Sequence, residues 1–330
     1  MHRVLAFLKA QALPLGMLSG VAVYLLFHWL PILNPLKPLA DGANTYVLPI
    51  MVFVMLFTTF CKVNPTEMKF CRWHGIMLLL QLSVCLFIAL ILHFSQHIGH
   101  KVVVEGALVC LIAPTGTAAV VIAGRLGGNE TTLTTYTILS NLTAAIMIPL
   151  VFPLVETQVT GYFLSQFLTI LHHIFPLLIC PFLAAWGLRA FFPKVHGWIT
   201  RLCGNLALYL WAISMIIAIG LTLRSLVNSH YDSYVLWMLG GAGLLACLWQ
   251  FGTGKLVGHR YHDYISCGQG AGQKNTIFAI WISYTYLSPV ASIAPSSYIL
   301  WQNIVNSWQL WQKQKKEKKE KKNNVTISKK

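Results

Sequence analysis

The sequence predicts an all-α membrane protein with ten transmembrane helices arranged as two inverted five-helix repeats. Composition is the first reason: 56% of the 330 residues are hydrophobic, only 10% are charged, and the mean hydropathy is +0.64. Soluble domains carry far more charge. The second reason is that apolar stretches of roughly 20 residues, the length that crosses a bilayer, follow one another along nearly the whole chain. The third is that two of these stretches are interrupted by polar, glycine and proline residues at matching positions.

Ten apolar stretches separated by polar or basic loops are the predicted spans. They cover residues 13–30, 45–60, 75–94, 103–123, 131–154, 163–188, 206–226, 235–251, 261–287 and 293–311. The two repeats would occupy residues 1–157 and 158–312, and we expect residues 313–330 to form a disordered, lysine-rich tail. The eight cysteines occur without a Cys-x-x-Cys pair, which favours buried apolar positions over a disulfide frame or a metal site.

Basic residues predict the orientation, because short loops rich in Lys and Arg stay cytoplasmic. They precede the first span and follow the second, fourth, sixth and eighth: Arg3, Lys9, Lys62, Lys69, Arg72, Arg125, Arg189, Lys194, Arg201, Lys255 and Arg260. The tail holds nine lysines and belongs on the same side, which an even number of spans permits. Both termini are therefore predicted to be cytoplasmic, in a multi-pass protein of the cell (inner) membrane. The net charge of +15 reflects this topology and contact with anionic lipid, not binding of nucleic acid.

The ninth predicted span is interrupted at residues 268–276, which read Gly-Gln-Gly-Ala-Gly-Gln-Lys-Asn-Thr. Three glycines in five residues lower the helix propensity, and the polar side chains include the cation of Lys274. Non-helical backbone at membrane depth persists only where it is buried in protein or lines a wet cavity. The interruption therefore indicates a binding site.

The fourth predicted span is interrupted at residues 113–117, which read Ala-Pro-Thr-Gly-Thr. A proline removes a helical hydrogen bond and clashes with the preceding turn. Each interruption lies in the fourth helix of a five-helix half, and an odd number of helices gives the two halves opposite orientations. Paired broken helices in inverted halves are typical of secondary transporters, with substrate bound where the breaks meet. The alternative is two incidental kinks, since Pro and Gly are frequent in spanning helices.

Three roles remain open for Lys274. It could snorkel or donate to backbone carbonyls and so serve the structure alone. It could load and release a proton in each transport cycle, or it could pair directly with an anionic substrate. No Asp or Glu falls in the middle of a predicted span, which leaves Gln81 and Thr137 as acceptors. Like charges a few ångströms apart repel by several kcal/mol inside a protein, so sodium and protonated Lys274 should exclude one another.

Several motifs resemble those of the bile acid:sodium symporter family. They are residues 114–118 and 126–129, Ser140, Pro149, Gly272, Asn275, Thr276 and residues 301–303. The resemblance implies a core domain made of the third to fifth and eighth to tenth helices, and a panel domain made of the others. It also implies an organic anion as substrate, held between the two domains. We expect this anion to contact Thr115, Gly116, Thr117, Asn275 and Thr276, where hydroxyl groups and helix N-termini can bind a carboxylate or sulfonate.

The departures from the family concern its sodium sites. The resemblance places the ligands of the first sodium at Ala119, Val120, Leu133, Thr137 and Gly270. It places those of the second at Gln81, Gly270, Lys274 and the carbonyls of Ala271 and Gln273. Few side-chain oxygens remain, and a cation replaces one ligand, so we expect neither sodium nor another cofactor, with a proton as the candidate coupling ion. The alternatives are a sodium-coupled symporter that uses a residual site, and a membrane sensor that transports nothing.

An intramembrane enzyme is a further class that the sequence argues against. It would need paired aspartates, a His-Glu-x-x-His zinc helix or a serine with a placed base, and none of these occurs within the predicted spans. His172 and His173 lie in the sixth span, where they could relay protons, contact substrate or hold carbonyls. The sequence does not choose among these roles for the histidine pair.

Overall fold

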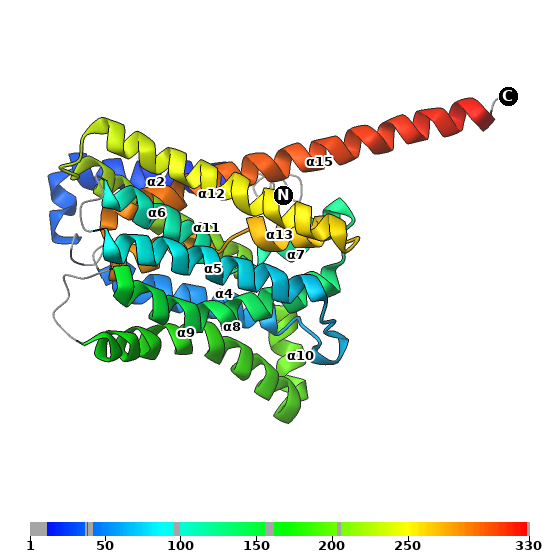
Figure 1. Cartoon of the computed structure of the whole chain (residues 1–330), viewed down its shortest axis with the longest axis horizontal. Coiled ribbons are helices and arrows are strands. Elements are labelled where there is room, and N and C mark those ends of the chain that lie inside the picture. Colours follow the sequence, from blue (N-terminus) through cyan, green and yellow to red (C-terminus); the bar gives the residue numbers. More distant parts are fainter. Residues whose placement is uncertain are drawn as a thin grey trace.

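The computed structural model describes residues 12–36, 38, 42–95, 100–155, 162–202 and 206–328. These residues form an all-α bundle, and no β-strand occurs among them. Most helices run along the long axis of the molecule, and the last one extends beyond the bundle at one end (Figure 1).

The helices follow one another with short connections. The α-helices are α2 (Ala12–Trp29), α4 (Leu48–Phe60), α5 (Arg72–Phe94), α6 (Lys101–Ile112), α7 (Ala118–Leu126), α8 (Glu130–Val155), α9 (Phe163–Phe191), α10 (Pro193–Leu202), α11 (Leu206–Val227), α12 (Ser233–Arg260), α13 (Tyr264–Gly272), α14 (Thr276–Tyr286) and α15 (Ile293–Ser328). Short helical turns of other types are η1 (Pro31–Leu36), η2 (Ala43–Val47), η3 (Pro65–Glu67) and η4 (Pro289–Ser292).

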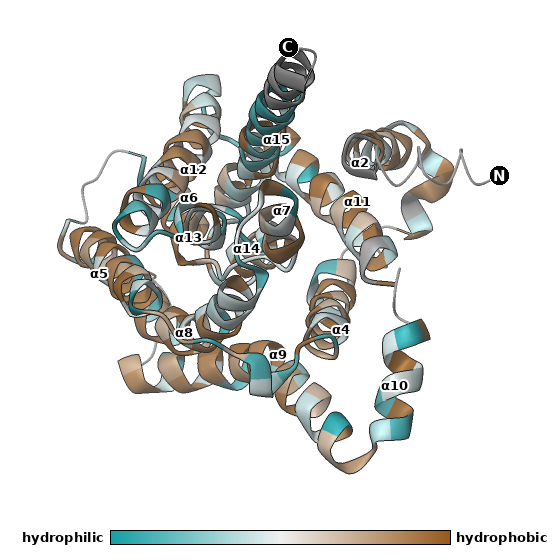
Figure 2. Ribbon diagram, turned by 90° about the vertical axis from the view of Figure 1, so that its right-hand side faces the viewer, coloured by the Kyte–Doolittle hydropathy of each residue, from teal (hydrophilic) through white to brown (hydrophobic). Residues whose placement is uncertain are grey.

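Six helical segments of the described chain are individually long and apolar enough to cross a bilayer. They are Ala43–Phe60, Arg72–Phe94, Glu130–Val155, Phe163–Phe191, Tyr209–Val227 and Ser233–Arg260. Hydrophobic residues dominate the helices of the bundle (Figure 2), and many of them are exposed. For example, Leu79, Phe87, Leu245 and Leu256 are 64–75% exposed. Such a surface suits contact with lipid, because in water it would drive association.

The main buried cluster lies where α4, α6, α8, α9, α12 and α14 pack together, and it includes Leu56, Ile112, Met147 and Phe278. A second, smaller cluster lies between α5, α7, α8 and α13, around Trp73 and Tyr136.

Three helices differ from the sequence-based expectation. The first is α12, which continues to Arg260 although the predicted span ends at residue 251, because its glycines let it run against α13. A Cβ on Gly258 would lie 2.6 Å from the Tyr264 Cα atom, and one on Gly254 would lie 2.7 Å from the Cys267 carbonyl oxygen. The second is α10, which occupies what we expected to be a loop.

The C-terminal segment also differs, since α15 continues to Ser328 through residues for which we expected disorder. Lys, Glu and Gln dominate this segment and have high helix propensity. The ion pair of Lys313 with Glu317, at 3.6 Å and helical i, i+4 spacing, adds support.

Some residues named in the sequence analysis lie outside the part of the chain that the structure describes. Arg3, Lys9, Cys203 and the expected boundary between the repeats at residues 157 and 158 lie outside the described residues. The described cysteines are free thiols, and five of them are buried.

Basic residues gather at the end of the bundle from which α15 emerges. The Lys313 ammonium donates to the carbonyl of Arg125 at the end of α7, over 2.8 Å. The Arg189 guanidinium at the end of α9 donates to the carbonyl of Val63, over 2.7 Å. We call this the basic end of the bundle.

Candidate functional site

Two non-helical segments meet inside the bundle. Residues 113–117 join α6 to α7, and residues 273–275 join α13 to α14. Thr115 and Lys274 pair as in an antiparallel β-bridge. The N–H group of Gly116 donates to the Gln273 carbonyl over 2.8 Å, and the N–H group of Asn275 donates to the Pro114 carbonyl over 2.9 Å. Each segment thus satisfies backbone groups of the other, as buried non-helical chain requires. We call the place where residues 113–117 and 273–275 meet the crossing.

The close approach of the two segments depends on Gly116. A Cβ atom at this position would lie 2.8 Å from the carbonyl oxygen of Lys274 and 3.0 Å from its carbonyl carbon. These are backbone atoms that cannot rotate away, so only glycine fits here without moving the crossing.

Side chains from neighbouring helices hold the crossing in place. The Thr115 hydroxyl donates to the Gly270 carbonyl (2.7 Å), and the Thr115 N–H donates to the Ser140 hydroxyl of α8 (3.0 Å). The Lys274 N–H donates to the Gln302 side-chain carbonyl of α15, over 3.1 Å. The backbone at the crossing is therefore fixed from both sides.

One face of α15 carries amides that extend this network toward the basic end. The Asn306 amide donates to the Gln273 side chain (2.6 Å) and accepts from the Gln269 amide (3.0 Å). Gln269 also donates to Gln309 over 3.4 Å. Sequence reasoning missed Gln269, Asn306 and Gln309 as part of the site. The signal was present, because Gln302, Asn306 and Gln309 recur at helical spacing along the tenth predicted span.

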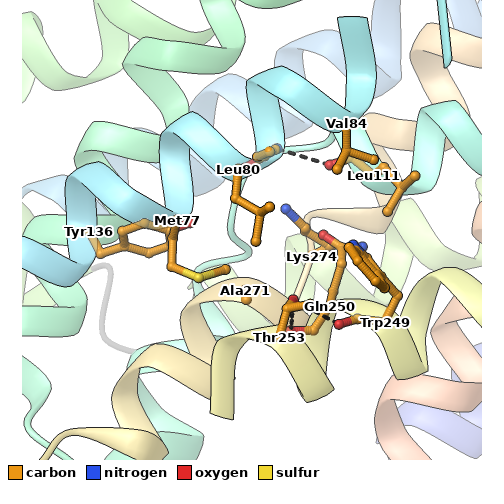
Figure 3. A pocket seen from close by; sticks show the side chains of 11 residues that line it. Met77, Leu80, Val84, Leu111, Tyr136, Trp249, Gln250, Thr253, Ala271 and Lys274 are labelled. Atoms are coloured by element: carbon orange, nitrogen blue, oxygen red, sulfur yellow. Dashed lines mark hydrogen bonds between the residues drawn. The ribbon is translucent and has the colours of Figure 1, made fainter. Parts of the chain in front are cut away.

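Lys274 is buried, with 3% of its surface exposed. Its side chain enters a small cavity of about 20 Å³, lined among others by Met77, Gln81, Tyr136 and Gln250. Figure 3 shows its nitrogen pointing toward the side chains of α5. Within the part of the chain that the structure describes, this ammonium has no hydrogen bond and no ion pair. The cavity has room for about one water molecule.

The two acceptors expected for Lys274 are placed differently. Gln81 shares the Lys274 cavity, and its amide donates to the carbonyls of Leu111 (2.9 Å) and Ile112 (3.1 Å) at the end of α6. Thr137 is buried, but its hydroxyl donates to the Leu133 carbonyl of its own helix over 2.9 Å, and it does not line the cavity. Gln81 therefore accompanies Lys274, whereas Thr137 does not.

Comparison with known protein families matches residues 49–229 to the Sodium Bile acid symporter family. The chain belongs to the sodium bile acid symporter family. The match covers the first non-helical segment and ends before the second. No curated protein matches the chain. Members of this family are transporters, so the chain is an integral multi-pass membrane protein, and the family indicates secondary transport of bile acid-type substrates.

The positions expected for the first sodium are lined mostly by apolar side chains. Ala119 and Leu133 lie in the apolar cluster around Trp73 and Tyr136. Gly270, an expected ligand position at both sodium sites, faces this cluster directly: a Cβ there would lie 2.7 Å from the Tyr136 ring. Sodium needs hard oxygen ligands, and this space is filled by an aromatic ring and aliphatic side chains.

The second sodium position also offers few oxygen ligands. Gln81 and the nearby backbone carbonyls remain, but Lys274 occupies the cavity with them. No group of three or more His, Cys, Asp or Glu side chains suited to a metal occurs among the described residues. The surviving donor set is therefore neutral and adjoins a cation, which disfavours a second cation.

The expected substrate residues fall into two groups. Thr115, Gly116 and Thr276 are buried in the crossing, whereas Thr117 and Asn275 are partly exposed. Asn275 begins α14, and its side chain accepts from the Phe278 N–H over 3.2 Å. In this conformation a ligand can therefore reach Thr117 and Asn275.

His172 and His173 lie on the exposed surface of α9, away from the crossing. The His173 Nδ1 atom is 3.0 Å from the hydroxyl of Tyr286 at the end of α14. The structure gives this histidine a partner but does not bring the pair to Lys274.

Proposed function

We propose that this family member transports an organic anion by alternating access without sodium, and that a proton on Lys274 takes the place of the ion. The observation that carries the proposal is the buried amino group of Lys274 beside the crossing, which has no hydrogen bond and no carboxylate partner among the described residues. An ionisable group inside a membrane protein is expensive to bury and is by default a functional candidate.

The proposed architecture has ten membrane spans in two inverted halves. If α6 with α7 and α13 with α14 each form one membrane span, and α10 lies at the membrane–water interface, the described helices supply ten spans. The interrupted ones are then the fourth and the ninth. The third to fifth and eighth to tenth would form the core, the others the panel, with the basic end and both termini in the cytoplasm.

The substrate of the proposal is a bile acid-like anion or a smaller carboxylate or sulfonate. Thr117 and Asn275 are the partly exposed members of the crossing, and α7 and α14 begin beside them. Helix N-termini present free N–H groups and a partial positive charge, which favour an anion without a charged side chain. The Lys274 cavity, at about 20 Å³, is too small for such a substrate, so we place the anion outside it.

Electrostatics links the anion to the proton. Two unit charges roughly 4 Å apart interact by about 4 kcal/mol at an effective dielectric constant near 20. Protonated Lys274 therefore repels a sodium ion in the neighbouring position and attracts an anion near the crossing. Loss of the proton removes both effects, so loading and unloading of substrate would follow loading and unloading of the proton.

The test is uptake of labelled bile acids, and of smaller carboxylates and sulfonates, by purified protein in liposomes. We expect an inward proton gradient to accelerate uptake and a sodium gradient to have no effect. Lys274→Gln should abolish uptake or remove its dependence on pH. Lys274→Arg keeps the charge but cannot release the proton, so it should also lose the dependence on pH.

Lys62→Gln is the matched control, because it removes one lysine from an exposed position, and it should behave as the unmodified protein. Uptake stimulated by sodium, together with normal behaviour of Lys274→Ala, would reject the proposal. That result would favour a residual sodium site built on Gln81 and return Lys274 to a structural role.

A further inference from the structure

A second, larger pocket lies at the basic end of the bundle, closer to that end than the Lys274 cavity. It has a volume of about 560 Å³ and is formed by the start of α5, the turn between α7 and α8, and the connection between α12 and α13. Its lining includes Arg72, Trp73, Thr132 and Asp263, and Thr132 donates to the Asp263 carboxylate over 2.9 Å. We call it the terminal pocket.

The same helices line both spaces at positions one turn apart. Helix α5 contributes Trp73 to the terminal pocket and Met77 to the Lys274 cavity, and α8 contributes Thr132 and Tyr136. Four residues of α-helix rise by about 6 Å. The barrier between the terminal pocket and Lys274 is therefore about one helical turn thick.

Three aromatic side chains make up this barrier: Trp73, His74 and Tyr136, each no more than 2% exposed. The His74 ring lies edge-on to Trp73, with 4.2 Å between ring centroids, and tilted against Tyr136 at 5.8 Å. Trp73 and Tyr136 are 5.0 Å apart. Trp73 faces the terminal pocket and Tyr136 the Lys274 cavity, so His74 adjoins both walls of the barrier.

The hydrogen bonding of His74 leaves one ring nitrogen available. The Cys71 N–H donates to Nδ1 over 3.3 Å, so in the neutral ring the hydrogen lies on Nε2. Nε2 is buried and has no partner with ordinary hydrogen-bond geometry among the described residues, although the Thr132 backbone lies near the ring. A buried polar group without a partner calls for an explanation, and transient contact with water or with a hydroxyl group would supply one.

The charged and titratable groups that face His74 come from three elements. Asp263 approaches from the connection between α12 and α13, Tyr136 from α8, and Cys71 from the segment that starts α5. Burial and then the Asp263 carboxylate raise the pKa of the Cys71 thiol, while Lys69 opposes them, so this thiol stays neutral. Histidine is the side chain of this set that ordinarily changes charge near neutral pH.

We infer that His74 passes protons between the terminal pocket and the Lys274 cavity. His74 takes a proton at Nδ1 from water in the terminal pocket, in place of the hydrogen bond from the Cys71 N–H group, and becomes an imidazolium near the Asp263 carboxylate. It then releases the proton on Nε2 toward the Tyr136 hydroxyl and the water of the cavity, and the neutral amine of Lys274 becomes an ammonium. One proton moves and the total charge is conserved. This inference rests on the proposed proton link to Lys274 and adds the route.

The experiment uses liposomes that hold the purified protein and a trapped pH-sensitive dye. Proton entry is followed during anion uptake, and exchange of labelled for unlabelled anion is followed at equal pH on both sides. His74→Gln should slow proton-linked uptake by about a hundredfold or more, the scale of a lost proton-transfer group, and shift its pH profile. Exchange at equal pH should stay within about twofold, because the crossing is untouched.

Two further variants keep the test decisive. Tyr136→Phe removes only the hydroxyl group, so it should slow proton entry even if His74→Gln folds poorly. His259→Gln changes an exposed histidine near the same end of the bundle and should leave both rates unchanged.

The failures of the two proposals are distinguishable. If the unmodified protein takes up anion without protons, the proton link itself fails. If it takes up protons, and His74→Gln and Tyr136→Phe do so at the unmodified rate and with the unmodified pH profile, the route through His74 alone is overturned.

Discussion

At Gly116 a hydrogen atom in place of a methyl group sets how closely the two non-helical segments approach. We expect Gly116→Ala to destabilise the protein by about 1–3 kcal/mol, the range for overpacking, because its Cβ would meet the Lys274 carbonyl at 2.8 Å. Thermal unfolding in detergent measures this. Gly187→Ala is the control, since nothing lies within 4 Å of a Cβ there. Equal melting temperatures for the two variants would show that the crossing tolerates a side chain.

Residue types in the sequence were enough to find the crossing, but not all the side chains that hold it. Lys274, Thr115 and Gly116 stand out because a cation, a hydroxyl and a glycine are unusual inside an apolar segment. His74 lies near the expected start of a span, where a histidine is unremarkable. Its importance depends on the buried ring contacts with Tyr136, which link residues far apart in the chain and have no periodic signature.

At the scale of helices, polar contacts join α11 to α14 and α15 at the end of the bundle opposite the basic end. The hydroxyls of Thr222 and Ser296 lie 2.7 Å apart. The Tyr284 hydroxyl donates to the Leu221 carbonyl and bonds the Ser225 hydroxyl. In the proposed architecture these contacts join the panel to the core, so this end must part when the transporter opens outward.

We expect a disulfide between Thr222→Cys and Ser296→Cys to stop uptake, because it would lock that end closed. The two positions are near enough for a bond of normal geometry, given the short distance between the native hydroxyls. Uptake in liposomes is measured before and after oxidation and again after reduction, which should restore it. Each single-cysteine variant is a control and should remain active. Full activity of the oxidised double variant would mean that this end does not part during transport.

Helix extents show where sequence reasoning stops at this scale. Apolar length predicts the middle of each helix well, since lipid contact requires it. It does not predict the end of α12, because the reach of that helix to Arg260 depends on Gly254 and Gly258 meeting α13. It also does not predict α10, because that amphipathic helix is too short to span a bilayer. The helical course of α15 beyond residue 312 escapes it as well, since propensity and ion pairs act there without apolar periodicity.

For the whole molecule, the distribution of charge connects fold and function. Asp and Glu are absent from the middle of the predicted spans, and in the structure Glu105 pairs with Lys101 over 3.4 Å near the start of α6. Lys274 therefore dominates the charge of the interior among the described residues. The sequence could predict this imbalance because it depends on composition along each span. The placement of the cavity and the terminal pocket could not be predicted, because both depend on packing between distant helices.

This charge distribution predicts that transport is electrically neutral. One monovalent anion and one proton on Lys274 carry no net charge, whereas one anion with two sodium ions would carry one. A membrane potential of 100 mV is worth about 2.3 kcal/mol per elementary charge, roughly fiftyfold in accumulation. We therefore expect anion accumulation at a fixed proton gradient to be unchanged when a potassium diffusion potential of about that size is imposed with valinomycin. Accumulation that follows the potential would contradict cotransport of one anion with one proton. It would indicate either additional cations or a lysine that stays protonated throughout the cycle.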